Sequence, residues 1–206
     1  MYLENVPANP RALFLFAHGA GAPMDSEFMD AFSEGLCARD IGVARFEFPY
    51  MRMRREDGHK RPPDREPQLL ECWRKVINDH RGQLPLFIGG KSMGGRMATV
   101  IATEEMPAKG VICLGYPFHP PGKPDRLRTG HFNQIKRPVL ILQGERDPFG
   151  TPGDVAEYGL PETVAVEWLT DGNHDWIPRK RSGLTWHDNM SRAVDLAVAF
   201  ILQHAA

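Results

Sequence analysis

The amino-acid sequence predicts an α/β protein whose mostly parallel sheet carries helices on both faces. Six short apolar runs recur along the chain, and most are continuous rather than alternating, which is typical of strands buried on both sides. Segments with helical periodicity lie between these runs, and strands that alternate with helices indicate parallel βαβ units. We therefore expect three layers, with about six to seven strands in the central sheet.

The elements follow one another in a regular order. The expected strands cover residues 12–17, 43–48, 85–89, 110–115, 138–144 and 163–169. The expected helices cover roughly residues 26–39, 66–80, 92–104, 151–159 and 187–203. The last helix has a wide apolar face, which predicts that it packs on the sheet. The stretch 49–65 is rich in proline and arginine and is predicted to be a loop.

Composition limits the function classes. The 206 residues, 42% hydrophobic and 25% charged, predict a single globular domain over residues 1–206. The net charge of −1 gives no bias toward nucleic acid or membranes, so neither is expected as a partner. Cys37, Cys72 and Cys113 match no zinc spacing and are expected to be reduced. The apolar run at 12–17 is too short for a signal core or a membrane span, so we expect a cytoplasmic protein.

One pentapeptide carries the strongest chemical signal. Residues 90–94, GKSMG, fit the pattern G-x-S-x-G between an expected strand and an expected helix. A nucleophile at such a sharp turn has a strained backbone, and the residues two before and two after it crowd each other unless they lack a Cβ. The sequence therefore predicts Ser92 as a nucleophile, and the structural alternative is a helix-capping serine.

A serine hydroxyl needs a positioned base to become a nucleophile. Asp147 lies in the loop after the next-to-last strand, and His174 follows the last strand by five residues. The order Ser92, Asp147, His174 is the one that this kind of turn predicts, and each residue lies at the carboxyl end of a strand, where active sites of such sheets collect.

Other side chains could fill the same roles. Glu145 or Asp154 could be the acid, although the proline that follows Asp147 fixes its turn. His187 and His119 could be the base, but His187 is expected to open the last helix and His119 to line the pocket.

Backbone groups near the serine predict an oxyanion site. The N–H of Met93 lies at the start of the helix, where donors are unpaired and the helix dipole is positive. The second donor is expected from the loop after the first strand, with Ala20 first and Gly21 next. Losing one such donor costs about 3 kcal/mol of transition-state stabilisation. His18 in the same loop is expected to be structural, with its ring bonded to a neighbouring loop.

Basic residues gather in three loops that should frame the mouth of the pocket. Loops 49–65, 116–136 and 170–183 hold thirteen basic and six acidic residues. This asymmetry predicts a preference for an anionic acyl or leaving group, and the alternative is a solvated rim with local ion pairs. The candidate pocket residues are Gly21, His119, Arg52 and Lys123.

Five segments carry a family resemblance: HGAGAPMD, GGKSMGGRMA, YPFHPPGKP, QGERDPFG and GNHDW, which together span residues 18 to 176. With them the chain resembles the α/β-hydrolase superfamily. More narrowly it is similar to the small lidless group related to dienelactone hydrolases, and within it to the testis-expressed and chromatin-complex hydrolase-like proteins. The resemblance implies the three-layer hydrolase fold and supports Ser92, Asp147 and His174 as nucleophile, acid and base.

Two departures from the family accompany this resemblance. Only about ten residues precede the first strong strand, so the opening hairpin of the fold is expected to be absent or reduced to one short edge strand. Dienelactone hydrolases carry a cysteine nucleophile, whereas this chain has a serine.

The expected activity is that of a serine hydrolase acting on a carboxylic ester or thioester through an acyl-enzyme, without metal or organic cofactor. Two alternatives remain at this stage. One is a non-catalytic interaction module that keeps the hydrolase fold, and the other is an acyltransferase that uses the same triad.

Overall fold

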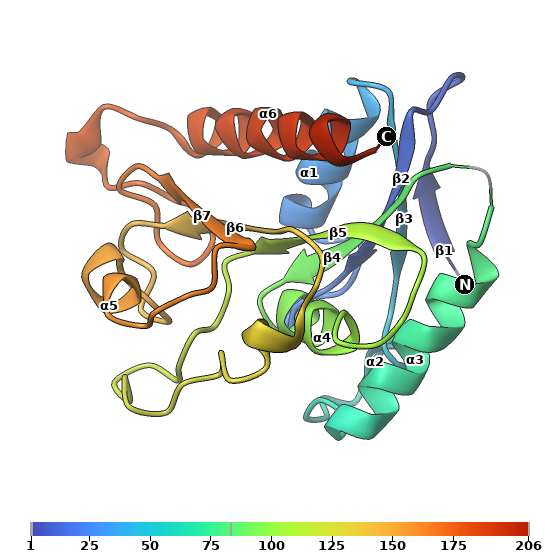
Figure 1. Ribbon diagram of the computed structural model, residues 1–206, viewed down its shortest axis with the longest axis horizontal. Coiled ribbons are helices and arrows are strands. Elements are labelled where there is room, and N and C mark those ends of the chain that lie inside the picture. The colour runs from blue at the N-terminus through green and yellow to red at the C-terminus, as the bar shows by residue number, and fades with distance from the viewer. Residues whose placement is uncertain (1, 83, 206) are drawn as a thin grey trace.

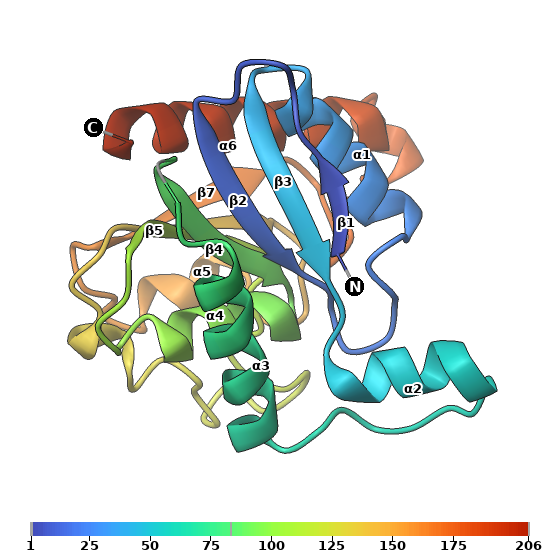
Figure 2. The same cartoon turned by 90° about the vertical axis from the view of Figure 1, so that its right-hand side faces the viewer.

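The computed structural model describes residues 2–82 and 84–205, and the strands of this part form one seven-stranded sheet (Figures 1 and 2). The strand order is β1-β3-β2-β4-β5-β6-β7. All neighbours are parallel except β1, which pairs antiparallel with β3. The strands are β1 (Tyr2–Asn5), β2 (Ala12–Ala17), β3 (Ile41–Phe46), β4 (Leu86–Lys91), β5 (Ala108–Leu114), β6 (Val139–Gly144) and β7 (Val164–Leu169). The predicted fold class is confirmed.

Helices cover both faces of the sheet, and each face has its own apolar core. Helices α1 (Glu27–Cys37) and α6 (Trp186–His204) lie on one face (Figure 1). Helices α3 (Glu66–Asp79) and α4 (Met93–Ile101) lie on the other, and α5 (Pro152–Ala156) contributes Val155 to the same core. Strand residues alternate between the two cores: Phe14 and Phe16 face α1 and α6, whereas Leu15 faces the opposite core.

One expected loop is a helix, so that part of the prediction is wrong. Residues Pro49–Asp57 form α2, which lies beyond the carboxyl end of β3 (Figure 2). Pro49 occupies the first turn, where a missing N–H costs nothing, and Gly58 ends the helix at φ +73° with its N–H on the Arg54 carbonyl at 2.9 Å. Arg54 and Arg55 in the last turn also favour the helix dipole. The other helices and strands end within a few residues of their predicted bounds, and β1 is the short edge strand that replaces the opening hairpin.

Three further features bear on the predictions. The described cysteines form no disulfide: Cys72 and Cys113 are buried and Cys37 is half-buried. No helix in the described part of the chain has the length and hydropathy needed to cross a bilayer. Residues 2–82 and 84–205 contain no cluster of three or more His, Cys, Asp or Glu side chains that could hold a metal ion.

His131 gives the fold a measurable pH dependence. Its half-buried ring contacts Thr99 Oγ1 through Nε2 at 2.8 Å. Burial, and then the charge of Arg96, lower the pKa of His131 from 6.5 to about 4. Between these values the unfolded chain binds a proton that the folded protein does not, so the free energy of unfolding falls as the pH falls through this window. Allowing for solvent screening of a half-buried ring, we expect a loss of about 1–2 kcal/mol.

Urea titrations of the wild type and His131→Gln across the window from pH 6.5 to about 4 test this expectation. The variant should lose less stability than the wild type over the same interval. Equal losses in both proteins would assign the acid sensitivity to other groups.

Candidate active site

Ser92 lies at a sharp turn between β4 and α4. Its backbone has φ 50° and ψ −113°, a conformation that residues other than glycine rarely adopt. A Cβ built on Gly90 would lie 2.5 Å from the Gly94 carbonyl carbon, and one on Gly94 would lie 2.5 Å from the His18 carbonyl oxygen. The two glycines therefore have no room for side chains, and the turn that they allow places Ser92 at the wall of a cavity.

The predicted acid and the predicted base form a direct pair. Asp147 follows β6, its carboxylate is fully buried, and its Oδ2 accepts a hydrogen bond from His174 Nδ1 at 2.7 Å. The other oxygen, Oδ1, accepts the Phe149 N–H at 2.9 Å. Because a carboxylate accepts both bonds, the proton of neutral His174 is on Nδ1 and the lone pair is on Nε2. This is the tautomer that a general base needs.

Two residues that the sequence did not single out shape the space around His174. Gly115 follows β5 with φ +67°, and a Cβ there would lie 3.2 Å from both Cε1 and Nδ1 of His174. The Phe149 ring lies against the imidazole, with 4.6 Å between the ring centroids. The positive φ and the close approach to His174 both require glycine at position 115. In the sequence, the only sign of this requirement was the glycine at the end of the run GVICLG.

The loop that carries His174 is anchored at both ends. Asn189 of α6 donates its amide hydrogens to the Thr170 carbonyl at 3.1 Å and the Trp176 carbonyl at 2.8 Å. Arg179 binds Asp171 through its guanidinium, and these hydrogen bonds lower the pKa of Asp171 to about 2. The predicted base, His174, is therefore held by a loop that is anchored at both ends.

Ser92 and His174 line one cavity of about 370 Å³. Its wall is formed mainly by the loop after β2 and the start of α1. The remaining lining residues are Gly19, Ala20, Gly21, Ala22, Ser26, Phe28, Met29, Lys91, Phe149 and Asp175. The cavity is large enough for a small acyl group and its leaving group.

The loop with Ala20 is fixed by buried hydrogen bonds. His18 Nδ1 donates to the Gly19 carbonyl at 2.6 Å, and its Nε2 accepts the Phe48 N–H at 3.1 Å. The Tyr50 hydroxyl, on α2, donates to the Ala20 carbonyl at 3.1 Å. Burial lowers the pKa of His18, which keeps the ring neutral for these two bonds. The prediction that His18 is structural and bonded to a neighbouring loop is confirmed.

Lys91, the residue before the serine, connects the two sides of the site. Its side chain is about 90% buried, and Nζ donates to the His174 carbonyl at 2.9 Å. The same Nζ lies 3.1 Å from the Asp175 carboxylate and 5.2 Å from the centre of the Phe28 ring. Burial lowers the pKa of Lys91. Lys91 thus holds the backbone of the loop that carries His174 beside the turn at Ser92.

Substitution Lys91→Met is expected to lower kcat by roughly 10- to 100-fold, because the His174 backbone loses its hydrogen bond to the residue that precedes Ser92. The free energy of unfolding should change by no more than about 1 kcal/mol, because Asp175, left without its partner, is solvent-exposed. Ester hydrolysis and urea unfolding of the same preparations measure the two effects. Loss of stability with unchanged kcat would show that Lys91 serves folding alone.

The four predicted pocket residues have different surroundings. Gly21 lines the Ser92 cavity, whereas Arg52 lines a separate cavity between α2 and α3. His119 is buried with its Nδ1 at the Pro120 carbonyl, and Lys123 is exposed. None of the thirteen basic side chains of the three loops lines the Ser92 cavity itself.

The alternative acids and bases make other contacts. Glu145 accepts the Asp171 N–H at 2.7 Å, and Asp154 caps α5 by accepting the Thr151 N–H at 2.9 Å. His187 is exposed in the first turn of α6. Of the carboxylates weighed, Asp147 alone is bonded to His174.

The fold and the match of residues 10–202 to the family model described as "Alpha/beta hydrolase domain" define the class of protein. The chain belongs to the α/β-hydrolase family. Among solved structures it is similar to Est1E of Butyrivibrio proteoclasticus with bound ferulic acid, at a TM-score of 0.75 and 14% identity over 99% of this chain and 94% of that one. It is also similar to a dienelactone hydrolase of Anabaena variabilis, at a TM-score of 0.72 and 18% identity over 98% and 90% of the two chains.

In sequence the chain is 28% identical over 179 residues to the non-reducing polyketide synthase CTB1 of Cercospora nicotianae. The same enzyme of Cercospora beticola is 28% identical over 177 residues. These alignments cover 84% and 83% of this chain but only 8% of either synthase. The two structural neighbours, at 14% and 18% identity, support the hydrolase fold.

Proposed function

We propose that the protein is a serine hydrolase that cleaves a small carboxylic ester or thioester through an acyl-enzyme. One observation carries the proposal. His174 lines the same cavity as Ser92, which is held in a strained strand-to-helix turn, and its ring is joined at 2.7 Å to the buried carboxylate of Asp147. Neither a capping serine nor a structural histidine requires this combination.

The first half of the reaction uses the proton positions of the pair. Ser92 Oγ attacks the ester carbonyl carbon while His174 Nε2 takes the hydroxyl proton. Asp147 accepts the Nδ1 hydrogen bond and stabilises the imidazolium. We assign the carbonyl oxygen of the tetrahedral intermediate to the N–H groups of Met93 and Ala20, at the start of α4 and in the fixed loop after β2.

The remaining steps release the leaving group, hydrolyse the acyl-enzyme and return the enzyme to its starting state. The imidazolium gives its proton to the alcohol or thiol leaving group as the bond to the acyl carbon breaks, which leaves the acyl group on Ser92. A water molecule then attacks the acyl carbon while His174 Nε2 takes its proton. The imidazolium returns that proton to Ser92 Oγ as the bond between Oγ and the acyl carbon breaks, and the acid product leaves.

Labelling with a fluorophosphonate probe tests the proposal. Wild-type protein should react covalently at Ser92, and Ser92→Ala should not react. A panel of esters and thioesters graded in size then defines the acyl group. A wild type that is folded, unlabelled and inactive on the panel would favour the interaction module that the resemblance to chromatin-complex hydrolase-like proteins suggests. Acyl transfer to an added alcohol in preference to water would favour the acyltransferase.

We propose that a preference for anionic substrates acts through long-range attraction, because the basic side chains of the three loops do not line the cavity. We therefore expect kcat/KM for a carboxylated ester to fall with added salt while kcat/KM for the matched neutral ester stays constant. Parallel measurements on the two esters over a salt series decide this. Equal dependence on salt for both would eliminate steering by the basic loops.

A further inference from the structure

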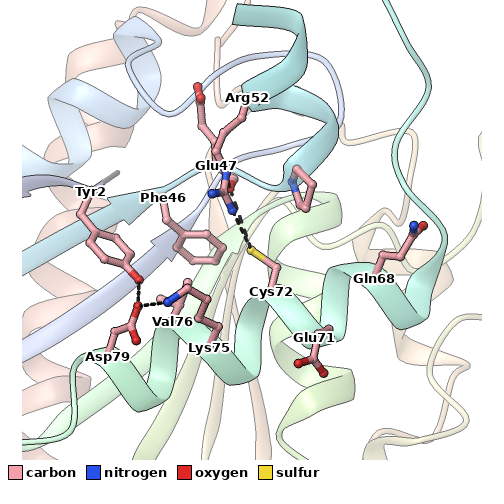
Figure 3. Close-up of a pocket in the computed structure, with 11 residues that line it drawn as sticks. Tyr2, Phe46, Glu47, Arg52, Gln68, Glu71, Cys72, Lys75, Val76 and Asp79 are labelled. Carbon is pink, nitrogen blue, oxygen red and sulfur yellow. Dashed lines mark hydrogen bonds and ion pairs between the residues drawn. The ribbon is translucent and has the colours of Figure 1, made fainter. Parts of the chain in front are cut away.

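A second cavity lies at the edge of the sheet and is unrelated to the hydrolase chemistry. It has a volume of about 460 Å³ and lies between strands β1 and β3 and helices α2 and α3 (Figure 3). It shares no lining residue with the Ser92 cavity. Phe46 and Val76, both almost fully buried, form an apolar wall, and the ring of Tyr2 stands beside them. The volume is in the range of small-molecule sites.

The acidic side chains around this cavity are already neutralised. Each carboxylate has a basic partner within ion-pairing distance. The pairs are Glu47–Arg55 at 2.6 Å, Glu71–Arg74 at 3.2 Å and Asp79–Lys75 at 2.8 Å. Asp79 also accepts the Tyr2 hydroxyl at 2.6 Å. The acids are thus occupied, and they leave little capacity for a cationic ligand.

Arg52 is the exception among the charged lining residues. Its side chain extends from α2 into the cavity toward Cys72 of α3 (Figure 3). Nε donates to the Glu47 carbonyl at 3.1 Å, and the other contact of the guanidinium is the Cys72 sulfur at 3.8 Å. It makes no ion pair with any residue in the described part of the chain. A half-buried guanidinium with only a carbonyl and a thiol as partners keeps most of its donors available.

We propose that this cavity binds a small aromatic carboxylate, with its carboxylate on Arg52 and its ring between Phe46, Val76 and Tyr2. The guanidinium presents parallel N–H donors that match a carboxylate, and the apolar wall removes a flat ring from water. The site is separate from the Ser92 cavity, so its ligand binds whether or not the protein hydrolyses esters.

Binding of 2-naphthoate to the full chain, measured by calorimetry, tests the proposal. The neutral isostere 2-naphthamide measures the contribution of the charge, and we expect it to bind about tenfold more weakly or worse. Arg52→Met should weaken the binding of 2-naphthoate by a similar factor. Arg54→Met is the matched control, because Arg54 is on the same helix but outside the cavity, and it should leave the affinity unchanged.

A measurement on the wild type alone locates the ligand. Cys72 lines the cavity and is 7% exposed, so occupancy should slow its reaction with methyl methanethiosulfonate, as followed by peptide mass spectrometry. Cys37, half-buried on α1, is the internal reference and should react at an unchanged rate. Binding that survives Arg52→Met, equal binding of the amide, or no protection of Cys72 would each overturn the proposal.

Discussion

Ser92→Ala is expected to lower kcat for ester hydrolysis by about 10⁶-fold, because no other hydroxyl can form the acyl-enzyme with His174. Ser26 also lines the cavity, but it lies at the start of α1 rather than at the strained turn after β4. The backbone at position 92 keeps its conformation because alanine has the same Cβ as serine. Binding of substrate should therefore survive the loss of turnover.

Steady-state kinetics on a 4-nitrophenyl ester, with the enzyme counted by active-site titration of the wild type, measure this loss. Ser191→Ala is a matched control, since Ser191 is exposed on α6 and does not line the cavity. His187→Ala tests the rival base in the same assay and should keep full activity. Residual kcat above about 1% of the wild type in Ser92→Ala would remove the serine from the mechanism.

The sequence was sufficient for the parts of the fold in which burial is nearly complete. β2, β3, β4, β5 and β6 are buried along almost their whole length, so each reads as a continuous apolar run. β1 is a half-buried edge strand of four residues, and so short a pattern carries little signal. In α2 only Tyr50 and Met51 are buried, so no apolar stripe marks the helix in the sequence. Pro49 and Gly58 are typical of the start and the end of a helix and could have indicated its bounds.

The same distinction applies to the site. Ser92, Asp147 and His174 each follow a strand, so parallel topology alone brings them to one edge of the sheet. Lys91 could not be found in this way, because its role depends on a contact with a carbonyl 83 positions away in the sequence. The positions of the basic side chains in the three loops could not be predicted from the sequence for a related reason. Arg55, for example, is paired with Asp25 and Glu47, and pairing of this kind depends on tertiary structure.

Asp147→Asn is expected to lower kcat by about 10⁴-fold by reversing the tautomer of His174. In the wild type both carboxylate oxygens accept hydrogen bonds, Oδ1 from the Phe149 N–H and Oδ2 from His174 Nδ1. An asparagine has one acceptor for these two donors. The backbone N–H of Phe149 cannot become an acceptor, so the amide oxygen stays with it and the amide NH₂ turns to the imidazole.

Facing an amide donor, His174 Nδ1 must accept, and its proton moves to Nε2, the nitrogen that must take the proton of Ser92. The variant therefore fails as a base while it keeps its shape, and its thermal unfolding should stay close to that of the wild type. Asp154→Asn is the control for the rival acid and should hydrolyse esters normally, because Asp154 caps α5. If Asp147→Asn were as active as Asp154→Asn, the bond between Asp147 and His174 would have no part in catalysis.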